Sequence, residues 1–231
     1  MAASRTEEPS ESAVAGDDEL RAVDGRVPGR RGMATRERLL EHTNRLLSST
    51  SYRDLKVVDI AREAGTSPAT FYQYFPDAES AVLALADRLI GEGGERLTLP
   101  FRAATWEGRA AYDACEQVAA AFLEFWDDHS ALMAVIDLAA LEGDQRFRDC
   151  RTHLLSQFTV LATEVITEQQ RLGVVSSELN PMATAVALVS MLAHVAAHQH
   201  GIDWAGVDRA QMRDAMARLI YTGVTGRTPP S

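Results

Sequence analysis

The segment TFYQYF at residues 70–75 concentrates aromatic and hydrogen-bonding side chains that could contact another molecule. Gly65, Ser67 and Pro68 precede it, and these residue types end one helix and begin the next. In a helical projection, Phe71 and Phe75 fall on one side and are expected in the core. The opposite side is expected to carry Ala69, Thr70, Gln73 and Tyr74, with Tyr72 at the boundary.

The polar-tipped side of this segment would suit contacts with DNA. Gln73 can pair with adenine through two hydrogen bonds, and Thr70 can contact a thymine methyl group. The hydroxyl groups of Tyr72 and Tyr74 can donate to phosphate oxygens, which positions a helix without reading bases. Backbone N–H groups from Ser67 to Thr70 would add an anion-binding helix end. The alternatives are tyrosine rings half inserted in the core and a glutamine that is merely solvated.

Basic residues gather around this segment although the chain as a whole is acidic. The net charge is −10 over 231 residues, yet residues 21–75 hold ten basic and six acidic side chains. A basic island in an acidic protein favours a local contact with a polyanion. Residues 1–32 are poor in large apolar side chains, so we expect a disordered arm. Its end is basic and includes Arg30 and Arg31.

Helices must hold these residues in place, and the apolar spacing predicts helices almost throughout from Thr35 onward. Thr35 is expected to cap the first helix, and a second helix is expected at residues 57–64. A turn at Gly65 and a third helix at residues 68–75 would complete a helix-turn-helix. We expect a fourth short helix next, and then a loose stretch rich in Gly, Pro and Thr to about Thr105.

The remainder of the chain is expected to form five longer helices, at residues 106–129, 130–143, 144–173, 180–200 and 208–226. The sequence therefore predicts an all-α fold of about nine helices, four short ones in front and five longer ones behind. We expect a disordered arm, a helix-turn-helix DNA-binding domain, a helical effector-binding and dimerisation domain, and a tail. Their expected bounds are residues 1–32, 33–78, 79–226 and 227–231.

Large and adaptable apolar side chains in the longer helices suit a ligand pocket for a hydrophobic effector. The candidates are Phe122, Phe125, Trp126, Met133, Phe158, Leu161, Met191 and His194. Ordinary core packing is the alternative for each of them. The last two helices are rich in alanine, which would allow close helix approach across a dimer axis or equally within one chain.

Other chemistries find less support in the sequence. It contains no GxSxG, P-loop, GxGxxG or HExxH motif, so we do not expect an enzyme. His194 and His198 have a spacing that suits zinc but lack the matching glutamate, and we expect no metal and no cofactor. Cys115 and Cys150 are expected to be free thiols. Without a secretory signal or a long uninterrupted apolar run, we expect a cytoplasmic protein that spans no membrane.

The stretch VVDIAREAGTSPATFYQYFPDAESAVLALADRL resembles the DNA-binding signature of the tetracycline-repressor (TetR) family, especially actinobacterial members with an FYxYFP helix. The resemblance runs from about Thr35 to Leu89. It implies that the third helix enters the major groove of a palindromic operator, as part of a homodimer. The implied DNA contacts are Pro68, Ala69, Thr70, Tyr72, Gln73 and Tyr74, beside the helix start at Ser67.

Two departures from the family pattern affect where phosphate is contacted. Ala78 stands where the family often has a phosphate-binding lysine, and Lys56 replaces a threonine before the second helix. Arg30 and Arg31 could substitute for the missing lysine from the arm, in a minor groove. Lys56 would bring an added charge near DNA.

The resemblance also implies a function for the longer helices. It implies a ligand-responsive transcriptional repressor that a small hydrophobic effector releases from DNA, with the last two helices forming the dimer bundle. A DNA-binding regulator or scaffold without a small-molecule ligand is the alternative. A cavity among the five longer helices would favour the former, and a filled core the latter.

Overall fold

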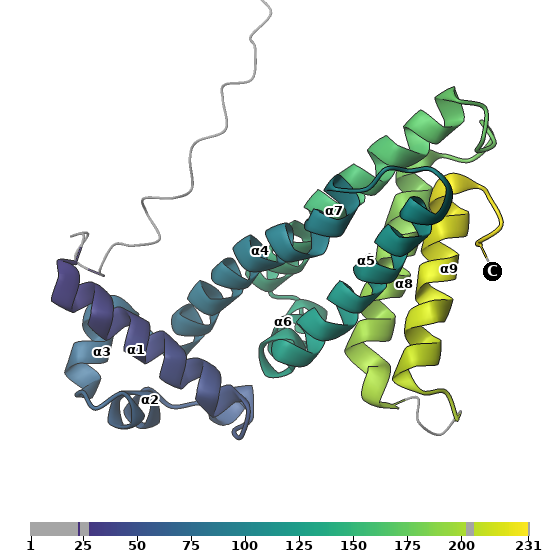
Figure 1. Ribbon diagram of the computed structural model, residues 1–231. Coiled ribbons are helices and arrows are strands. Elements are labelled where there is room, and N and C mark those ends of the chain that lie inside the picture. Colours follow the sequence, from purple (N-terminus) through teal and green to yellow (C-terminus); the bar gives the residue numbers. More distant parts are fainter. Residues whose placement is uncertain (1–22, 24–27, 202–205, 231) are drawn as a thin grey trace, which may run out of the picture.

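The computed structural model describes residue 23, residues 28–201 and residues 206–230, and its regular elements are helices, as predicted (Figure 1). The first part holds α1 (Arg30–Leu47), α2 (Val57–Glu63), α3 (Pro68–Tyr74) and the long α4 (Ala78–Arg102), with a 3-10 turn, η1 (Tyr52–Asp54). The second part holds α5 (Gly108–Asp128), α6 (Ser130–Glu142), α7 (Gln145–Arg171), α8 (Pro181–His198), η2 (Gln199–Gly201) and α9 (Arg209–Thr225). The all-α fold is confirmed for the residues that the structure describes.

The first helix begins earlier than we expected. Gly29 is its N-cap residue, without a side-chain hydrogen bond, and Arg30 and Arg31 form its first turn. Thr35, which we expected as the cap, lies inside the helix, where its hydroxyl donates to the carbonyl of Arg31 at 3.1 Å. The cap prediction was wrong because a threonine hydroxyl can bond back to the preceding turn as readily as it can cap. The two arginines therefore belong to α1 and not to an arm that ends at residue 32.

The fourth helix is much longer than the sequence suggested, because it continues through the stretch that we expected to be loose. Gly93 and Gly94 lie in its middle and are buried. A Cβ atom on Gly93 would lie 2.3 Å from Leu154 Cδ1, and one on Gly94 would lie 2.7 Å from Gln157 Nε2. The glycines therefore allow α4 to approach α7 closely, and this packing outweighs their low helix propensity.

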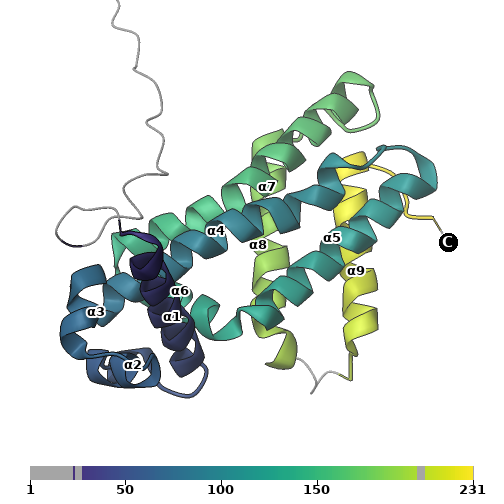
Figure 2. The same cartoon turned by 60° about the vertical axis from the view of Figure 1, so that its left-hand side comes forward.

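The second part of the molecule is a packed helical layer around an aromatic core. α4 packs on α7 and α5 packs on α9, while α6 contacts α1. Figures 1 and 2 show α1, α2 and α3 gathered at the beginning of α4, on the side of the molecule away from α8 and α9. α4 is thus the main covalent and structural link between the two parts.

The helices α8 and α9 leave an apolar face uncovered. The segment Pro181–Gly201, which contains α8, is long and apolar enough to cross a membrane by length and composition, which alone is weak evidence. Only 28% of its apolar window is buried inside the monomer. Val186 on α8 and Leu219 on α9 are about half exposed, at 48% and 52%. These two helices therefore present apolar side chains that this chain does not itself cover.

Candidate DNA interface and effector cleft

The third helix starts with a side-chain cap that fixes its orientation. The backbone N–H of Thr70 donates to Ser67 Oγ at 3.1 Å, and Pro68 occupies the first turn. Gly65 has a φ of +65°, which allows the chain to turn between α2 and α3. Because the cap occupies the N–H of Thr70 and Pro68 has none, the helix start offers fewer free N–H groups to an anion than we expected.

The core face of α3 is as predicted, but the outer face differs from the prediction. Tyr72, expected at the boundary, is exposed, and Tyr74, expected to point outward, packs partly against the core. Phe71 is fully buried and Phe75 is 3% exposed, and their ring centroids lie 5.5 Å apart. The guanidinium of Arg36 in α1 lies over the Phe75 ring at 5.1 Å, so the base of α3 is held on α1. The opposite side leaves Tyr72 (51% exposed) and Gln73 uncovered. The aromatic cluster thus serves both as core and as surface.

The other residues predicted at the DNA interface also lie on the surface of α1–α3. Ala69 and Pro68 are exposed, whereas Thr70 and Tyr74 are partly buried. The cap residue Ser67 is exposed, as is Lys56, which precedes the first turn of α2. Arg30 and Arg31 are exposed at the N-terminal end of α1. The backbone N–H of Val23 donates to the carbonyl of Gln73 at 3.0 Å, which places this upstream residue beside the end of α3.

The start of α4 carries no positive charge to replace the missing lysine. Ala78 is its first residue, and Asp77 caps the helix by accepting from Ser80 N and Ser80 Oγ, both at 2.7 Å. A carboxylate here repels phosphate and does not bind it. Exposed cations of α1–α3 are therefore the available phosphate contacts on this side of the molecule.

The α6–α7 corner joins the second part of the molecule to η1 and to the start of α4. Glu142, at the end of α6, forms an ion pair with Arg53, and Arg146, in the first turn of α7, pairs with Glu79 of α4. The Phe147 ring meets Tyr52 edge-on, with centroids 6.2 Å apart, and burial raises the pKa of Tyr52 to about 12. One short segment thus contacts both η1 and the start of α4.

A cleft of about 800 Å³ opens next to this corner, between the end of α5, α6, the start of α7 and the end of α8 with η2. Trp126, Met133 and His194, which we predicted for the pocket, line it. The volume falls within the range of small-molecule sites. The second part of the molecule is therefore not a completely filled core.

The other predicted pocket residues do not line this cleft. Phe122, Phe125 and Phe158 are buried, and the Phe122 ring contacts the Phe158 ring at 5.2 Å and stacks on Trp126 at 5.7 Å. Leu161 and Met191 are partly buried and pack against the core. Phe122, Phe125 and Phe158, which we expected to line a pocket, fill the interior behind this cleft instead.

Charged residues that we did not predict form part of the cleft wall. Arg151 Nε bonds Asp137 Oδ1 at 2.9 Å, and Arg148 Nε donates to the carbonyl of Ala140 at 3.0 Å. At the other end, Asp127 accepts from His200 Nε2 at 2.9 Å and pairs with Arg209. Charged side chains on a helix are usually solvated. These meet only because α7 packs on α6, and because the end of α5 lies beside η2 and the start of α9.

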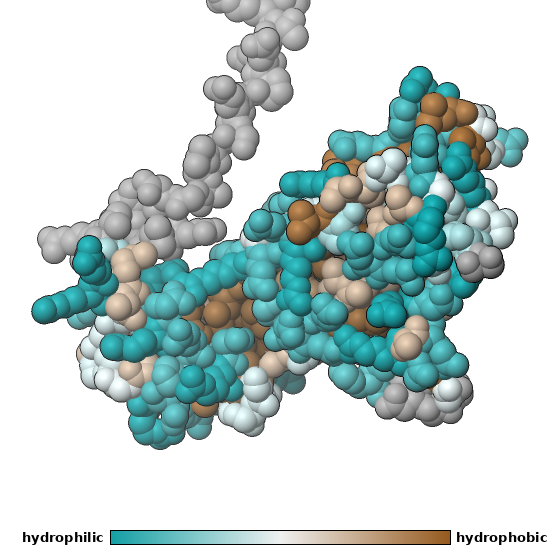
Figure 3. Space-filling view, viewed as in Figure 1, coloured by the Kyte–Doolittle hydropathy of each residue, from teal (hydrophilic) through white to brown (hydrophobic). Residues whose placement is uncertain are grey.

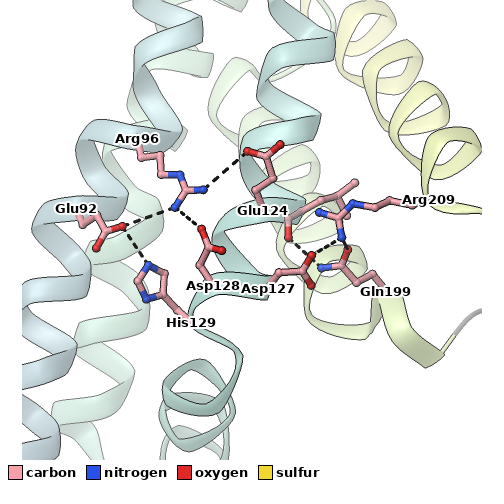
Figure 4. A network of polar contacts seen from close by, with 9 residues as sticks. Glu92, Arg96, Glu124, Asp127, Asp128, His129, Gln199 and Arg209 are labelled. Atoms are coloured by element: carbon pink, nitrogen blue, oxygen red, sulfur yellow. Dashed lines mark hydrogen bonds and ion pairs between the residues drawn. The ribbon is translucent and has the colours of Figure 1, made fainter. Parts of the chain in front are cut away.

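A polar network ties α4 to the end of α5 (Figure 4). Arg96 Nη1 lies 2.7 Å from Asp128 Oδ2 and 3.7 Å from Glu92 Oε1. His129 Nε2 lies 3.1 Å from Glu92 Oε1, and its ring lies 4.7 Å from that of Phe125. The figure shows these side chains pointing toward one another between the two helices, next to the Asp127–Arg209 contacts.

The histidine pair in α8 does not belong to a larger ligand set. The His194 and His198 rings are 4.2 Å apart, and a His198 nitrogen, Nδ1, lies 2.9 Å from the carbonyl oxygen of His194. Within the part of the chain that the structure describes, no group of three or more His, Cys, Asp or Glu side chains could hold a metal ion.

The hydropathy of the surface differs between the two parts. Figure 3 shows a mainly hydrophilic surface over α1–α3 and hydrophobic residues along the middle of α4 and at the far end of α7. A capped helix-turn-helix with a polar outer face, attached through a long helix to a larger helical domain with a cleft, defines a two-domain DNA-binding regulator.

The chain belongs to the TetR family of bacterial transcriptional regulators, which are DNA-binding proteins and not enzymes. Residues 39–85 match the profile described as "Bacterial regulatory proteins, tetR family". Residues 100–231, more than half of the chain, match the profile described as "Tetracyclin repressor-like, C-terminal domain". The predicted family membership is thereby confirmed.

Known proteins are similar to this chain over different lengths. The regulator EthR of Mycolicibacterium smegmatis is 25% identical over 169 residues, which cover 71% of this chain and 76% of EthR. EthR of Mycobacterium tuberculosis is 39% identical over 54 residues, only 23% of this chain and 25% of that protein.

Solved structures share the fold at low identity. The fatty acid degradation regulator FadR of Bacillus halodurans has a TM-score of 0.64 at 16% identity, covering 88% of this chain and all of that one. FadR of Bacillus subtilis, solved in complex with stearoyl-CoA, has a TM-score of 0.63 at 15% identity, covering 83% and 98%. At these identities the likeness concerns the fold.

Proposed function

We propose that this protein is a ligand-responsive transcriptional repressor that binds a palindromic operator as a homodimer and is released by a small hydrophobic effector. The observation that carries the proposal is the position of the cleft. Its α6 and α7 walls meet at the corner that contacts η1, between α1 and α2, through Arg53–Glu142, and the start of α4, which follows α3, through Arg146–Glu79. A ligand that moves this corner would change the position of α3.

On the DNA side, α3 would enter the major groove with Thr70, Gln73 and Tyr74 toward the bases and Tyr72 toward a phosphate. The exposed positions of Tyr72 and Gln73 support this assignment. The remaining assigned contacts are Arg30, Arg31, Lys56, Ser67, Pro68 and Ala69. Arg30 and Arg31 would contact phosphate or the minor groove from the first turn of α1.

The partner for the uncovered face of α8 and α9 would be a second copy of the chain. Exposed alanines and Val186 on α8, together with Leu219 on α9, supply the small and apolar side chains that close helix packing requires. A two-fold axis through this face would pair two α3 helices for the two halves of a palindrome.

The effector would occupy the cleft between α6, α7 and α8. Trp126 and Met133 supply apolar surface there, and FadR of Bacillus subtilis, a protein of the same fold, was solved with stearoyl-CoA bound. A cleft of this size also favours a ligand-responsive regulator over the alternative, a DNA-binding regulator or scaffold without a ligand.

The proposal also covers the bounds of the two domains, the cellular location and the family members that this chain resembles. We assign DNA binding to residues 33–78, preceded by the first turn of α1, and effector binding and dimerisation to residues 79–226. We place the protein in the cytoplasm. Among TetR regulators, we propose that it resembles most the actinobacterial members with an FYxYFP helix. EthR of Mycobacterium tuberculosis, which is 39% identical to this chain over 54 residues, supports the likeness to actinobacterial members.

A cleft-filling variant tests the regulatory part of this proposal. The operator is first selected from fragmented genomic DNA with the full chain, and release by a panel of hydrophobic molecules is then measured by gel shift. Ala134→Trp, on the α6 wall, is expected to keep operator binding and lose release, because the indole would fill the cleft. Ala110→Trp, exposed at the opposite end of α5, is the control. Normal release from Ala134→Trp would contradict the proposal.

A further inference from the structure

The start of α7 places two guanidinium groups at the same wall of the cleft. Arg148 and Arg151 are three residues apart and therefore neighbours on the helix surface, and both line the cleft. Each is oriented by a hydrogen bond from Nε, that of Arg148 to the Ala140 carbonyl at 3.0 Å and that of Arg151 to Asp137 at 2.9 Å. Their Nη nitrogens are left for other acceptors.

The charges around this wall do not balance. Asp137 is the acidic partner of Arg151, whereas Arg148 forms no ion pair with the residues that the structure describes. The other carboxylate of the cleft, Asp127, pairs instead with Arg209 and His200 at the α5–η2 end. The α7 wall therefore has one positive charge in excess, with donors in the planar arrangement that matches a carboxylate or phosphate.

Buried apolar side chains also line the cleft. Trp126 and Met133, at the end of α5 and in α6, are 5% and 2% exposed. The indole Nε1 of Trp126 is also buried, with no hydrogen-bond partner in the described part of the chain. The cleft thus combines apolar surface with a cationic wall.

We propose that the effector is an amphiphile whose apolar part lies against Trp126 and Met133 and whose anionic group, a carboxylate or a phosphate, is held by Arg148 and Arg151. This inference rests on the proposed function and narrows the chemical class of its effector. It also places the anion one turn from Arg146 and Phe147, which contact the start of α4 and η1. Binding of the headgroup would therefore act directly on the corner.

Three probes with the same alkyl chain test this proposal: decanoate, decyl phosphate and decanol. Binding to the full-length protein is measured by calorimetry below the micelle concentration, and DNA release is measured in parallel. At least one anionic probe is expected to bind about tenfold more tightly than decanol. Whichever of decanoate and decyl phosphate binds more tightly shows whether the site prefers a carboxylate or a phosphate.

Arginine variants show whether that preference comes from α7. In the double variant Arg148→Gln/Arg151→Gln the anionic preference is expected to disappear while decanol binding is unchanged. Arg171→Gln, at the other end of α7 and paired with Glu168, is the control and is expected to behave as the wild type. Thermal unfolding of each variant checks that the fold is retained.

The outcomes separate the two proposals. Equal binding of decanol and both anions, or a preference that survives in the double variant, overturns the headgroup site and leaves a hydrophobic effector standing. Arginine-dependent binding that never changes DNA affinity supports the headgroup site and contradicts ligand-responsive repression. If none of the probes binds, both proposals fail for this cleft.

Discussion

α3 and the α8–α9 pair each leave one face uncovered, and the chemistry of the two faces differs. The face of α3 ends in hydroxyl and amide groups on Tyr72 and Gln73, which can donate and accept hydrogen bonds. The face of α8 and α9 consists largely of small and apolar side chains such as Val186 and Leu219. Exposure alone therefore does not define a partner, because the first face suits the edges of bases and the second suits another protein surface.

The comparison predicts its largest effect for a charge placed on the apolar face. Leu219→Glu is expected to weaken self-association by about 3–5 kcal/mol, because an unpaired carboxylate would be buried in the interface. Analytical ultracentrifugation should then show a monomer, and operator affinity should fall with it. Leu99→Glu, at a similarly exposed leucine of α4, is the control and should leave the dimer intact. If the Leu219→Glu protein remains a dimer, the α8–α9 face is not the dimer interface and the contrast between the two faces fails.

On the α3 face, loss of one amide is expected to have a smaller and sequence-dependent effect. Gln73→Ala should cost about 1–3 kcal/mol at one operator position and relax the base preference there. Tyr72→Phe should weaken binding to all sequences alike, since only a phosphate contact is lost. Asn44→Ala, an exposed amide on the α1 face that carries Glu37, is the control. Gel-shift titrations of single-base operator variants measure these effects, and an unchanged preference in Gln73→Ala refutes the assigned face.

The first turn of α1 should contribute affinity without specificity. Replacement of Arg30 and Arg31 by alanine is expected to reduce the salt dependence of DNA binding by about one unit of slope for each arginine. Specific and non-specific DNA should be affected equally, because phosphates carry no base information. Arg45→Ala, in the last turn of the same helix, serves as the comparison. The assignment fails if fluorescence anisotropy at several salt concentrations gives the same slope for the double variant and the wild type.

The smallest predicted effect concerns an exposed ion pair that joins α1 to α4. Arg88 holds the pKa of Glu37 below its usual value, mainly through a hydrogen bond to the carboxylate. This stabilisation is present above pH 4.5 and is lost as pH falls through the lowered pKa, because protonation removes the charge. Both side chains are more than 40% exposed, so Arg88→Gln should cost less than about 1 kcal/mol at pH 7.

Urea unfolding at pH 7 and at pH 3 measures that contribution. The difference between wild type and Arg88→Gln should shrink at the lower pH. Arg102→Gln, at an α4 arginine that has no ion pair with the described residues, should show no such pH dependence. A difference that grows on acidification would show that the pair does not act through the ionised Glu37.

The sequence was most informative where structure depends on near neighbours. The turn at Gly65, the start of α3 at Ser67 and Pro68, and its core face with Phe71 and Phe75 each follow from a few consecutive residues, and the structure shows all three. Thr35 is the exception. Its hydroxyl bonds the carbonyl of Arg31 in the preceding turn, and a threonine in such a sequence can equally cap a helix. Local signals therefore predicted most of the DNA-binding helices.

Features that depend on distant residues were predicted less well. The course of α4 through Gly93 and Gly94 is set by Leu154 and Gln157, about sixty residues further along the chain, and no local pattern indicates this. The charged wall of the cleft at Arg148 and Arg151 arises only when α6, α7 and α8 come together. The all-α class was predictable because helical periodicity is local, whereas the cleft is a product of packing.

The close approach at Gly93 and Gly94 gives α4 the mechanics of a lever. With no Cβ atoms, the helix is seated against α7 there, so this point can act as a fulcrum. Ala78 lies about 22 Å along the helix axis from Gly93, at 1.5 Å per residue. A tilt of about 5° at the fulcrum would carry Ala78 through about 2 Å, with α3 attached immediately before it. A small tilt of α4 at this contact would therefore become a larger displacement at α3, the helix that we propose touches DNA.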